Sequence, residues 1–204
     1  VQEYALIIEY ERDDAPRTYY WIGGSGNWED AANWSLTSGG QASGAIPSNR
    51  DQVIFDRNSF GSLGQDQAFT IQLNASTAVA GISWFGEKSG QVELNGNRLT
   101  IANDVYLSDR NAAIQGGELV VTPSTNKARI FANADLTNAT LVVDAQQGQV
   151  DLVGRMNLAE LVIESGQVTF LGDTLSVNNW IARTTASKSF GSTNAVIEVR
   201  NAIN

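Results

Sequence analysis

The stretch Gln147–Gly154 (QGQVDLVG) returns in almost the same form at Ser165–Gly172 (SGQVTFLG), and a third version precedes both at Ser89–Gly96 (SGQVELNG). Each version carries Gly-Gln-Val, an apolar residue two places later and a closing Gly. Repetition of a short apolar segment along one chain is typical of architectures in which one structural unit stacks on the next.

A second series of apolar segments interleaves with the first. It consists of Glu118–Val121, Thr140–Val143 and Glu160–Ile163, and the Leu in each lies 22 and then 20 residues after its predecessor. A period near 20, with two or three short strands in each unit, is what one coil of a parallel β-helix requires. A single coil cannot bury its apolar face, so several must stack.

The rest of the chain agrees with an all-β fold. No stretch keeps the apolar spacing of an amphipathic helix, and short apolar segments alternate with Gly, Asn, Ser and Asp, which form turns. Asn is frequent between the segments, where it can occupy left-handed corners and stack on Asn of the next coil. We predict a parallel β-helix or β-solenoid-like stack of short coils; a β-sandwich with chance similarities is the alternative.

Three segments are expected along the chain. Residues 1–17 read as a strand and a charged linker, either the end of a preceding domain or a cap over an open strand edge. Residues 18–66 form a Trp- and Gly-rich capping segment, and residues 67–204 form the solenoid. The chain begins without the basic stretch and cleavage site of a signal peptide, and we expect it to be part of a longer exported protein.

Composition excludes several classes of function. The net charge is −9, and the 13 Lys and Arg are scattered, so nucleic acid is not an expected partner. No apolar run approaches the roughly 20 residues of a spanning helix. Cys and His are absent, which removes disulfides, thiol catalysis, Ser-His-Asp triads and the usual zinc sites.

The most distinctive local motif is Tyr19–Trp34 (YYWIGGSGNWEDAANW), and it is followed by Ile46–Asp56 (IPSNRDQVIFD). We interpret the first stretch as a tight Gly turn that places Trp rings over a small apolar surface, and the second as a Pro-bounded loop that leads into a strand. The predicted structural cap motif comprises Trp21, Gly23, Gly24, Gly26, Trp28, Trp34, Pro47 and Phe55.

These two stretches resemble a module of exported repetitive cell-surface proteins of the Bacteroidetes, and the segment Trp180–Val199 resembles the tail of that module. The resemblance implies a large secreted or surface-anchored polypeptide, exported by type 9 secretion and related to gliding or attachment adhesins. It supplies no catalytic motif. Glu29 departs from the pattern, which has Ser or Thr there.

The five Trp residues allow two interpretations. Trp21, Trp28 and Trp34 are expected to plug the end of the coil stack, because large amphipathic rings suit that place. Stacking on sugar rings is the alternative. Trp84 and Trp180 are the residues for which ligand stacking stays open.

Oxygen-bearing side chains could serve catalysis or metal binding. The carboxylates considered for polysaccharide cleavage are Asp104, Asp109, Asp135, Asp144, Asp151 and Asp173, of which Asp144 and Asp151 could meet across a turn. Catalysis needs two carboxylates in one cleft, and nothing in the spacing indicates convergence. Hard oxygen ligands suit Ca²⁺, and Asp13, Asp14, Asp51, Asp56 and Asn58 are the candidates for a structural ion. Gly23–Gly26 lacks the Lys of a phosphate loop.

We therefore expect a non-enzymatic structural or adhesive module, extracellular, without a cofactor and not membrane-spanning. Its partners would be neighbouring domains of the same polypeptide and a surface glycan or other cell-surface component. A carbohydrate-binding or polysaccharide-degrading β-helix is the alternative, and a domain that stabilises a catalytic neighbour is a third possibility.

Overall fold

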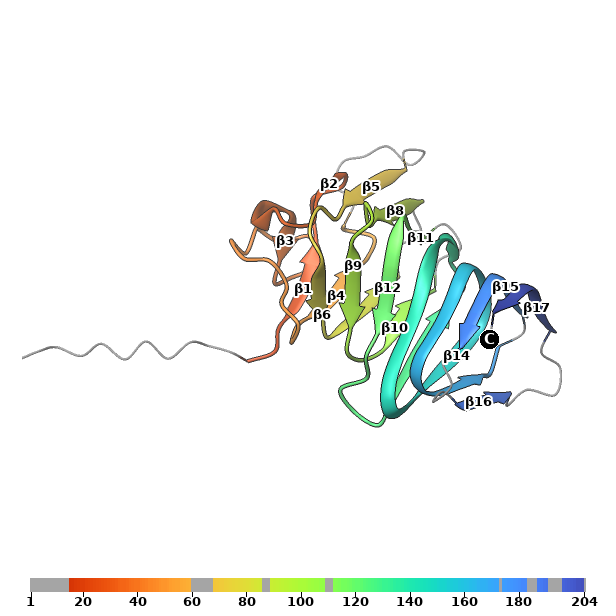
Figure 1. Cartoon of the computed structure of the whole chain (residues 1–204). Coiled ribbons are helices and arrows are strands. Elements are labelled where there is room, and N and C mark those ends of the chain that lie inside the picture. The colour runs from red at the N-terminus through yellow and green to blue at the C-terminus, as the bar shows by residue number, and fades with distance from the viewer. Residues whose placement is uncertain are drawn as a thin grey trace, which may run out of the picture.

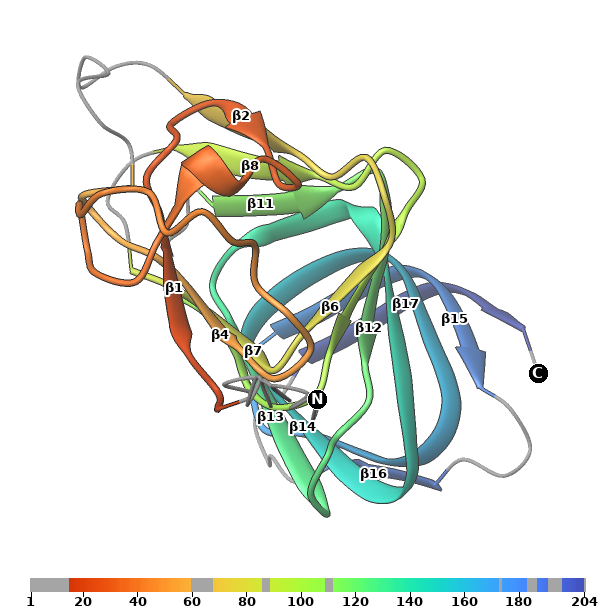
Figure 2. The same ribbon diagram turned by 90° about the vertical axis from the view of Figure 1, so that its left-hand side faces the viewer.

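The chain winds into a stack of coils built almost entirely from short parallel strands (Figure 1). The computed structural model describes residues 15–59, 68–85, 89–108, 112–172, 174–182, 187–190 and 196–203. Within these ranges the one helix is the single 3₁₀ turn η1 (Ala31–Asn33), and none is long and apolar enough to span a membrane. Figure 2 views the stack from its N-terminal end and shows the coils one behind another.

Three ladders of strands run along the stack. The first ladder contains β1 (Thr18–Trp21), β4 (Gln52–Phe55), β7 (Gly81–Trp84), β10 (Val105–Leu107), β13 (Lys127–Ala132), part of the long β14 (Asp135–Phe170) and β16 (Ser187–Phe190). Its rungs are parallel: Val53 pairs with Ile82, Ile82 with Val105 and Val105 with Ile130.

The other two ladders complete each coil. The second contains β2 (Gly26–Asn27), β5 (Phe69–Gln72), β8 (Gly90–Glu93), β11 (Ala112–Gln115) and the beginning of β14. The third contains β6 (Thr77–Val79), β9 (Arg98–Ile101), β12 (Gly117–Val121), a further part of β14, and the second halves of β15 (Thr174–Ala182) and β17 (Val196–Ile203), whose first halves continue the second ladder. The strand β3 (Trp34–Ser35) pairs antiparallel with β1.

The core is the apolar interior of the coils. Alternate residues of each strand point inward, as the pleat requires, and Leu99, Leu119 and Leu141 pair rung by rung in the third ladder. All three are buried. The predicted β-solenoid is confirmed, and the series of segments with a period near 20 occupies successive rungs.

The similar stretches at 89–96, 147–154 and 165–172 do not all occupy equivalent places. Gln149 pairs with Lys127 in the first ladder, and Gln167 pairs with Ser187 of that ladder. Gly90 instead pairs with Phe69 in the second ladder. The stretch Ser89–Gly96 therefore resembles the other two in sequence but occupies a different ladder of the coil. The resemblance is possible because the same apolar-polar alternation suits a strand of any ladder that has one face on the core.

Asparagines form the predicted corners between ladders. Asn95 has a left-handed φ of 51°, and its side-chain amide donates to Gln72 Oε1 at 2.8 Å in the coil before it. The amide of Asn97 donates to the Leu73 carbonyl at 3.0 Å, and the amide of Asn74 donates to Asn27 Oδ1 at 3.3 Å. These contacts link the corners of successive coils.

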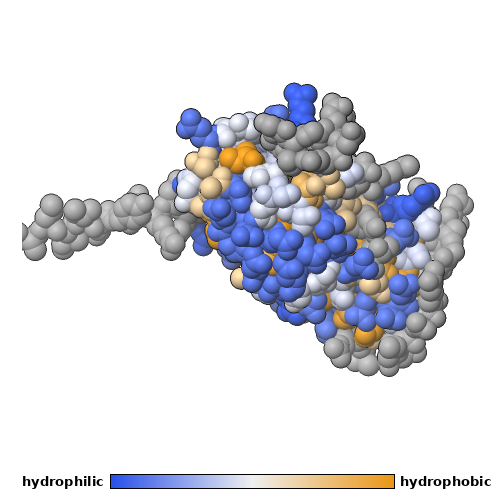
Figure 3. All heavy atoms as spheres, turned by 90° about the horizontal axis from the view of Figure 1, so that it is seen from above, coloured by the Kyte–Doolittle hydropathy of each residue, from blue (hydrophilic) through white to orange (hydrophobic). Residues whose placement is uncertain are grey.

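The Trp-rich segment joins the coils directly. Its strand β1 pairs with β4, and β2 pairs with β5, so residues 18–59 supply the first rungs of the first two ladders. The expected boundary at residues 66 and 67 lies outside the described residues, as do the predicted strand Tyr4–Tyr10 and the carboxylates Asp13 and Asp14. The face seen from above is mostly hydrophilic, with small scattered apolar areas (Figure 3).

Candidate functional site

The N-terminal end of the core is filled by a cluster of Trp rings. Trp21, Trp28 and Trp34 are each 0% exposed. The ring of Trp34 makes edge-to-face contacts with Trp21 at 4.9 Å and with Trp28 at 4.8 Å between centroids. Edge-to-face geometry is favourable for aromatic pairs. These rings are closed off from solvent, so the alternative in which they stack on a sugar does not hold.

Two of the indole N–H groups bind the backbone of the same segment. Trp21 Nε1 donates to the Gly24 carbonyl at 2.8 Å, and Trp34 Nε1 donates to the Trp28 carbonyl at 2.7 Å. Gly24 has a φ of 61°, a left-handed conformation that glycine adopts without strain. These bonds explain why the Trp and Gly residues of the motif occur together.

The Asn33 side chain explains the other two glycines of the motif. A Cβ at Gly23 would lie 2.3 Å from Asn33 Oδ1, and one at Gly26 would lie 2.7 Å from Asn33 Nδ2. The Asn33 amide also donates to the Asn27 carbonyl at 3.0 Å. Both glycines therefore leave room for a side chain that ties the turn together.

The Pro-bounded loop is held by a buried carboxylate. Asp51 is 6% exposed; its Oδ2 accepts from the backbone N–H and the hydroxyl of Ser48, each at 2.7 Å, and its Oδ1 accepts from the Arg17 N–H at 2.8 Å. Pro47 and Phe55, on either side of this carboxylate in the chain, are buried.

The other calcium candidates of this region serve a surface turn. Asp56 accepts from the hydroxyl of Ser38 at 2.6 Å and from the Asn58 N–H at 2.9 Å, and the Asn58 amide donates to Ser38 Oγ at 2.9 Å. Within the described ranges, no three carboxylate, His or Cys side chains gather in a way that could hold a metal ion.

Glu29 connects the Trp-rich segment to the turn after β5. Its Oε1 accepts from the backbone N–H of Asn74 at 2.7 Å and of Ala75 at 3.0 Å. Ser or Thr, the residue of the resembling pattern, is too short to reach both groups in the same way. Glu29 thus fastens the first rungs to the next coil at this corner, together with the bond from the Asn74 amide to Asn27 Oδ1.

We expect Glu29→Ala to lower the free energy of unfolding by about 1 kcal/mol, since two backbone N–H groups at a half-exposed site lose their acceptor. Glu29→Gln keeps one side-chain oxygen and should lose less. Urea denaturation followed by circular dichroism measures both. Equal stability of Glu29→Ala and the unaltered chain would contradict this role.

Trp84 is not available for ligand stacking. Its side chain is 0% exposed and lies between Phe55, at 4.7 Å, and Phe69, at 5.5 Å and 21°. It extends the Trp cluster into the next coils. Ligand stacking, which the sequence leaves open for this residue, does not fit a ring that strand alternation directs into the core.

Trp180 takes the inward register of the third ladder. It pairs with the buried Leu161 and packs, partly buried, against the main core. The two Trp residues therefore do not form an exposed pair on one face.

The carboxylates considered for catalysis have separate partners. Asp104 Oδ1 accepts from the Arg129 backbone N–H at 2.7 Å, and Asp144 accepts from the Ser165 hydroxyl at 2.6 Å.

Asp151 is buried; its Oδ2 lies 2.6 Å from Lys127 Nζ, and its Oδ1 accepts from the Gln149 amide. Asp109, Asp173 and the side chain of Asp135 lie outside the described residues. The spacing across a turn did not bring Asp144 and Asp151 to a shared partner.

An exposed aromatic row lies instead on the outer face of the first ladder. Tyr106 on β10 and Phe131 on β13 pair in register, and their rings stack at 4.7 Å with an interplanar angle of 15°. Phe85 lies 5.4 Å from Tyr106 at the other side. Phe85 is 51% exposed and Tyr106 is 38% exposed. We call Phe85, Tyr106 and Phe131 the outer aromatic row.

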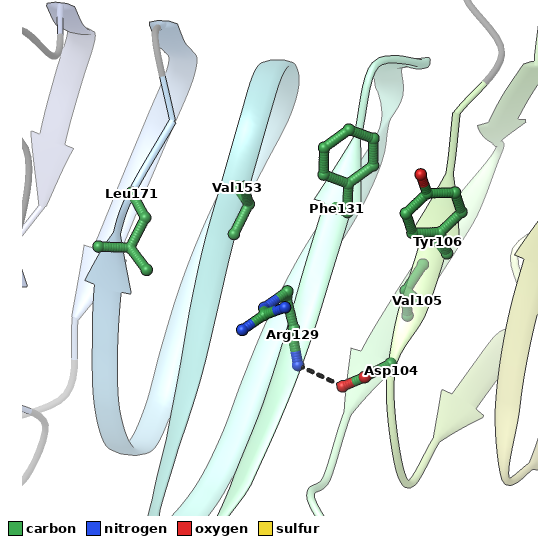
Figure 4. A pocket seen from close by; sticks show the side chains of 7 residues that line it. All are labelled: Asp104, Val105, Tyr106, Arg129, Phe131, Val153 and Leu171. Atoms are coloured by element: carbon green, nitrogen blue, oxygen red, sulfur yellow. Dashed lines mark hydrogen bonds between the residues drawn. The ribbon is translucent and has the colours of Figure 1, made fainter.

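A hollow of about 320 Å³ lies at the end of this row. Figure 4 shows Tyr106, Phe131, Val153 and Leu171 side by side on neighbouring strands, with Arg129 and Asp104 along one edge. Leu171 is 42% exposed. The hollow lies toward the lower end of the roughly 300–1,000 Å³ typical of small-molecule sites.

The outer aromatic row was missed because sequence reasoning followed the Trp residues. A signal was present in Val105-Tyr106-Leu107 and Ile130-Phe131-Ala132, where an aromatic residue stands between two apolar ones. In a half-buried strand such a residue must point outward. The pairing of the two strands, which only the fold shows, places the two rings together.

Comparison of the chain with protein-family models, with curated proteins and with solved structures finds no match.

Proposed function

We propose that the chain is a non-enzymatic structural and adhesive module of a larger secreted or surface-anchored bacterial protein. The observation that carries this proposal is the unbroken sequence of parallel rungs from β1 to β16 in the first ladder. In such a stack each coil is stabilised chiefly by its neighbours. A rod of this kind holds its outer face at a distance from its point of attachment.

The closed N-terminal end supports the same function. Aromatic rings fill the core where no earlier coil is described, and Asp51 and Glu29 fasten the loops around them. A protected end reduces pairing with other chains. The resemblance of Tyr19–Trp34 to exported surface modules is the reason for proposing a bacterial surface protein exported by type 9 secretion.

The non-enzymatic part of the proposal is supported by the carboxylates. Asp144 and Asp151 are hydrogen-bonded or ion-paired to different side chains, and Asp104 supports the Arg129 backbone. A glycosidase needs two carboxyl groups on either side of one bond, at most about 9.5 Å apart. In the described residues these side chains serve coil-to-coil contacts.

Single-molecule pulling of the chain from its two termini tests the mechanical function. We expect stepwise extension, each step releasing one coil; beyond the first two coils, which are longer, successive rungs lie about 20–25 residues apart, so each step should release roughly 7–9 nm of chain at about 3.3–3.6 Å per residue. One featureless extension at low force would contradict a load-bearing rod. Release of reducing ends from polysaccharides incubated with the purified chain would contradict the absence of an enzyme.

A second candidate function is carbohydrate binding. The specific observation in its favour is the outer aromatic row, since exposed aromatic rings beside polar side chains suit sugars, which have apolar faces and hydroxyl edges. Binding of this kind would supply the adhesive contact of the module.

A further inference from the structure

The hollow at the end of the outer aromatic row lies where the stacking of aromatic rings along the ladder stops. Tyr106 and Phe131 stack at 4.7 Å, which is the spacing of neighbouring strands. Phe131 pairs in register with Val153. At Val153 the row therefore changes from a ring to a short side chain, and one face of Phe131 is left uncovered by a further ring.

Leu171 forms the opposite wall of this place. Its backbone N–H donates to the Leu152 carbonyl at 2.8 Å, which sets Leu171 beside Val153 on the next rung. Phe131 and Leu171 are thus two rungs apart, or about 9.5 Å. A gap of two rungs holds one flat ring, about 4.8 Å from Phe131 on one side and from Leu171 on the other, lying over the Val153 side chain.

Two polar side chains lie along one edge of the same hollow (Figure 4). Arg129 and Asp104 are both exposed, and Asp104 Oδ1 accepts from the Arg129 backbone N–H. Within the described part of the chain, the Arg129 guanidinium itself makes no hydrogen bond or ion pair. The hollow thus offers five N–H donors on Arg129 and a carboxylate acceptor on Asp104.

This combination identifies the chemistry of the ligand. The two opposite charges leave the edge of the hollow without net charge, and the chain as a whole carries −9, so an anionic ligand gains nothing overall. An aromatic side chain of a protein partner would fill the gap but leave the donor and acceptor unused. A neutral pyranose satisfies both parts, since one ring face is apolar and its hydroxyl groups donate and accept.

We propose that the gap between Phe131 and Leu171 binds one pyranose ring of a neutral glycan, stacked on Phe131 and hydrogen-bonded by Arg129 and Asp104. This inference rests on the proposed adhesive function only in naming the surface partner. It is independent of the mechanical strength of the rod. The glycan chain would continue along the outer face of the first ladder.

The sharpest test fills the gap from within the protein. Val153→Phe continues the stack of Tyr106 and Phe131 and occupies the place of the sugar, so it should preserve the fold and remove binding. Phe131→Ala removes the stacking face and should weaken binding about tenfold, the loss of roughly 1.4 kcal/mol. Ile54→Phe, in the same ladder on β4, is the matched control and should bind normally.

The probes are neutral pentasaccharides of glucose, mannose, galactose and xylose, with a uronic-acid oligosaccharide and an aromatic peptide as comparison ligands, measured by isothermal titration calorimetry with the whole chain. Thermal melts of every variant confirm that the coils are intact. Binding of at least one probe that is lost in Val153→Phe and retained in Ile54→Phe supports the proposal.

Three outcomes would overturn it. They are no binding of any probe at millimolar concentration, binding that Val153→Phe leaves unchanged, and binding restricted to uronic-acid oligosaccharides or aromatic peptides. A chain that fails here but extends coil by coil under force would keep its structural function. A chain that binds these sugars but yields at low force would lose that function and keep the site.

Discussion

Replacing Trp34 by Ala is expected to lower the free energy of unfolding by about 3–5 kcal/mol, the usual cost of deleting a fully buried large aromatic side chain. Trp34 is 0% exposed and touches Tyr19, Trp21, Trp28 and Phe55. Its indole also donates to the Trp28 carbonyl. The substitution therefore leaves a cavity and an unpaired carbonyl at the end of the core.

The loss should begin in the first rungs, because contacts in a stack of coils are mainly between neighbours. Urea denaturation followed by circular dichroism measures the total, and hydrogen exchange of the β1 and β4 amides reports where opening starts. Leu36→Ala is the control, since Leu36 is 45% exposed and should change stability by less than about 0.5 kcal/mol. Similar losses for both variants would exclude a special role of the Trp cluster.

Replacing Gly90 by Ala should cost about 1–3 kcal/mol or more, although Ala is a better strand residue than Gly. A Cβ at Gly90 would lie 1.9 Å from Phe69 Cζ and 2.0 Å from Phe69 Cε1. Phe69 is fully buried and stacks on Trp84, so its ring has no free space into which it can move. Overpacking of this kind forces side chains and backbone to shift.

A double-mutant cycle separates this clash from other effects. In a Phe69→Ala background the added methyl group meets no ring, and the cost of Gly90→Ala should largely disappear. Gln91→Ala, on the outward side of the same strand, is the single-site control. Equal costs of Gly90→Ala with and without Phe69, measured by chemical denaturation, would show that the clash does not determine stability.

The fold could be predicted because its signal is repeated. Leu119, Leu141 and Leu161 repeat at nearly constant intervals, and constant intervals are what stacked coils require. The position of each similar stretch within its coil was harder to predict. Gly90 makes room for the Phe69 ring, whereas Gly166 adopts a left-handed φ of 82°. The same residue type at equivalent positions of two similar stretches therefore serves two different structural purposes.

The candidate site could be predicted only in part. The Trp and Gly residues of the N-terminal motif are close in the sequence, so their association in a cap was a reasonable expectation. The sequence leaves ligand stacking open for Trp84 and Trp180, because Trp often serves that purpose. Their inward register depends on which residues of each strand face the core.

The class of the fold follows from the amino-acid sequence alone, since period, alternation and turn residues are local properties that every coil repeats. The sequence also excludes His and Cys chemistry. Which side chains become neighbours across coils depends on how the coils stack. Tyr106, Phe131, Val153 and Leu171 lie on different rungs, and their distances follow from a register that is set by the lengths of the intervening turns. The outer aromatic row and its gap exist for that reason alone.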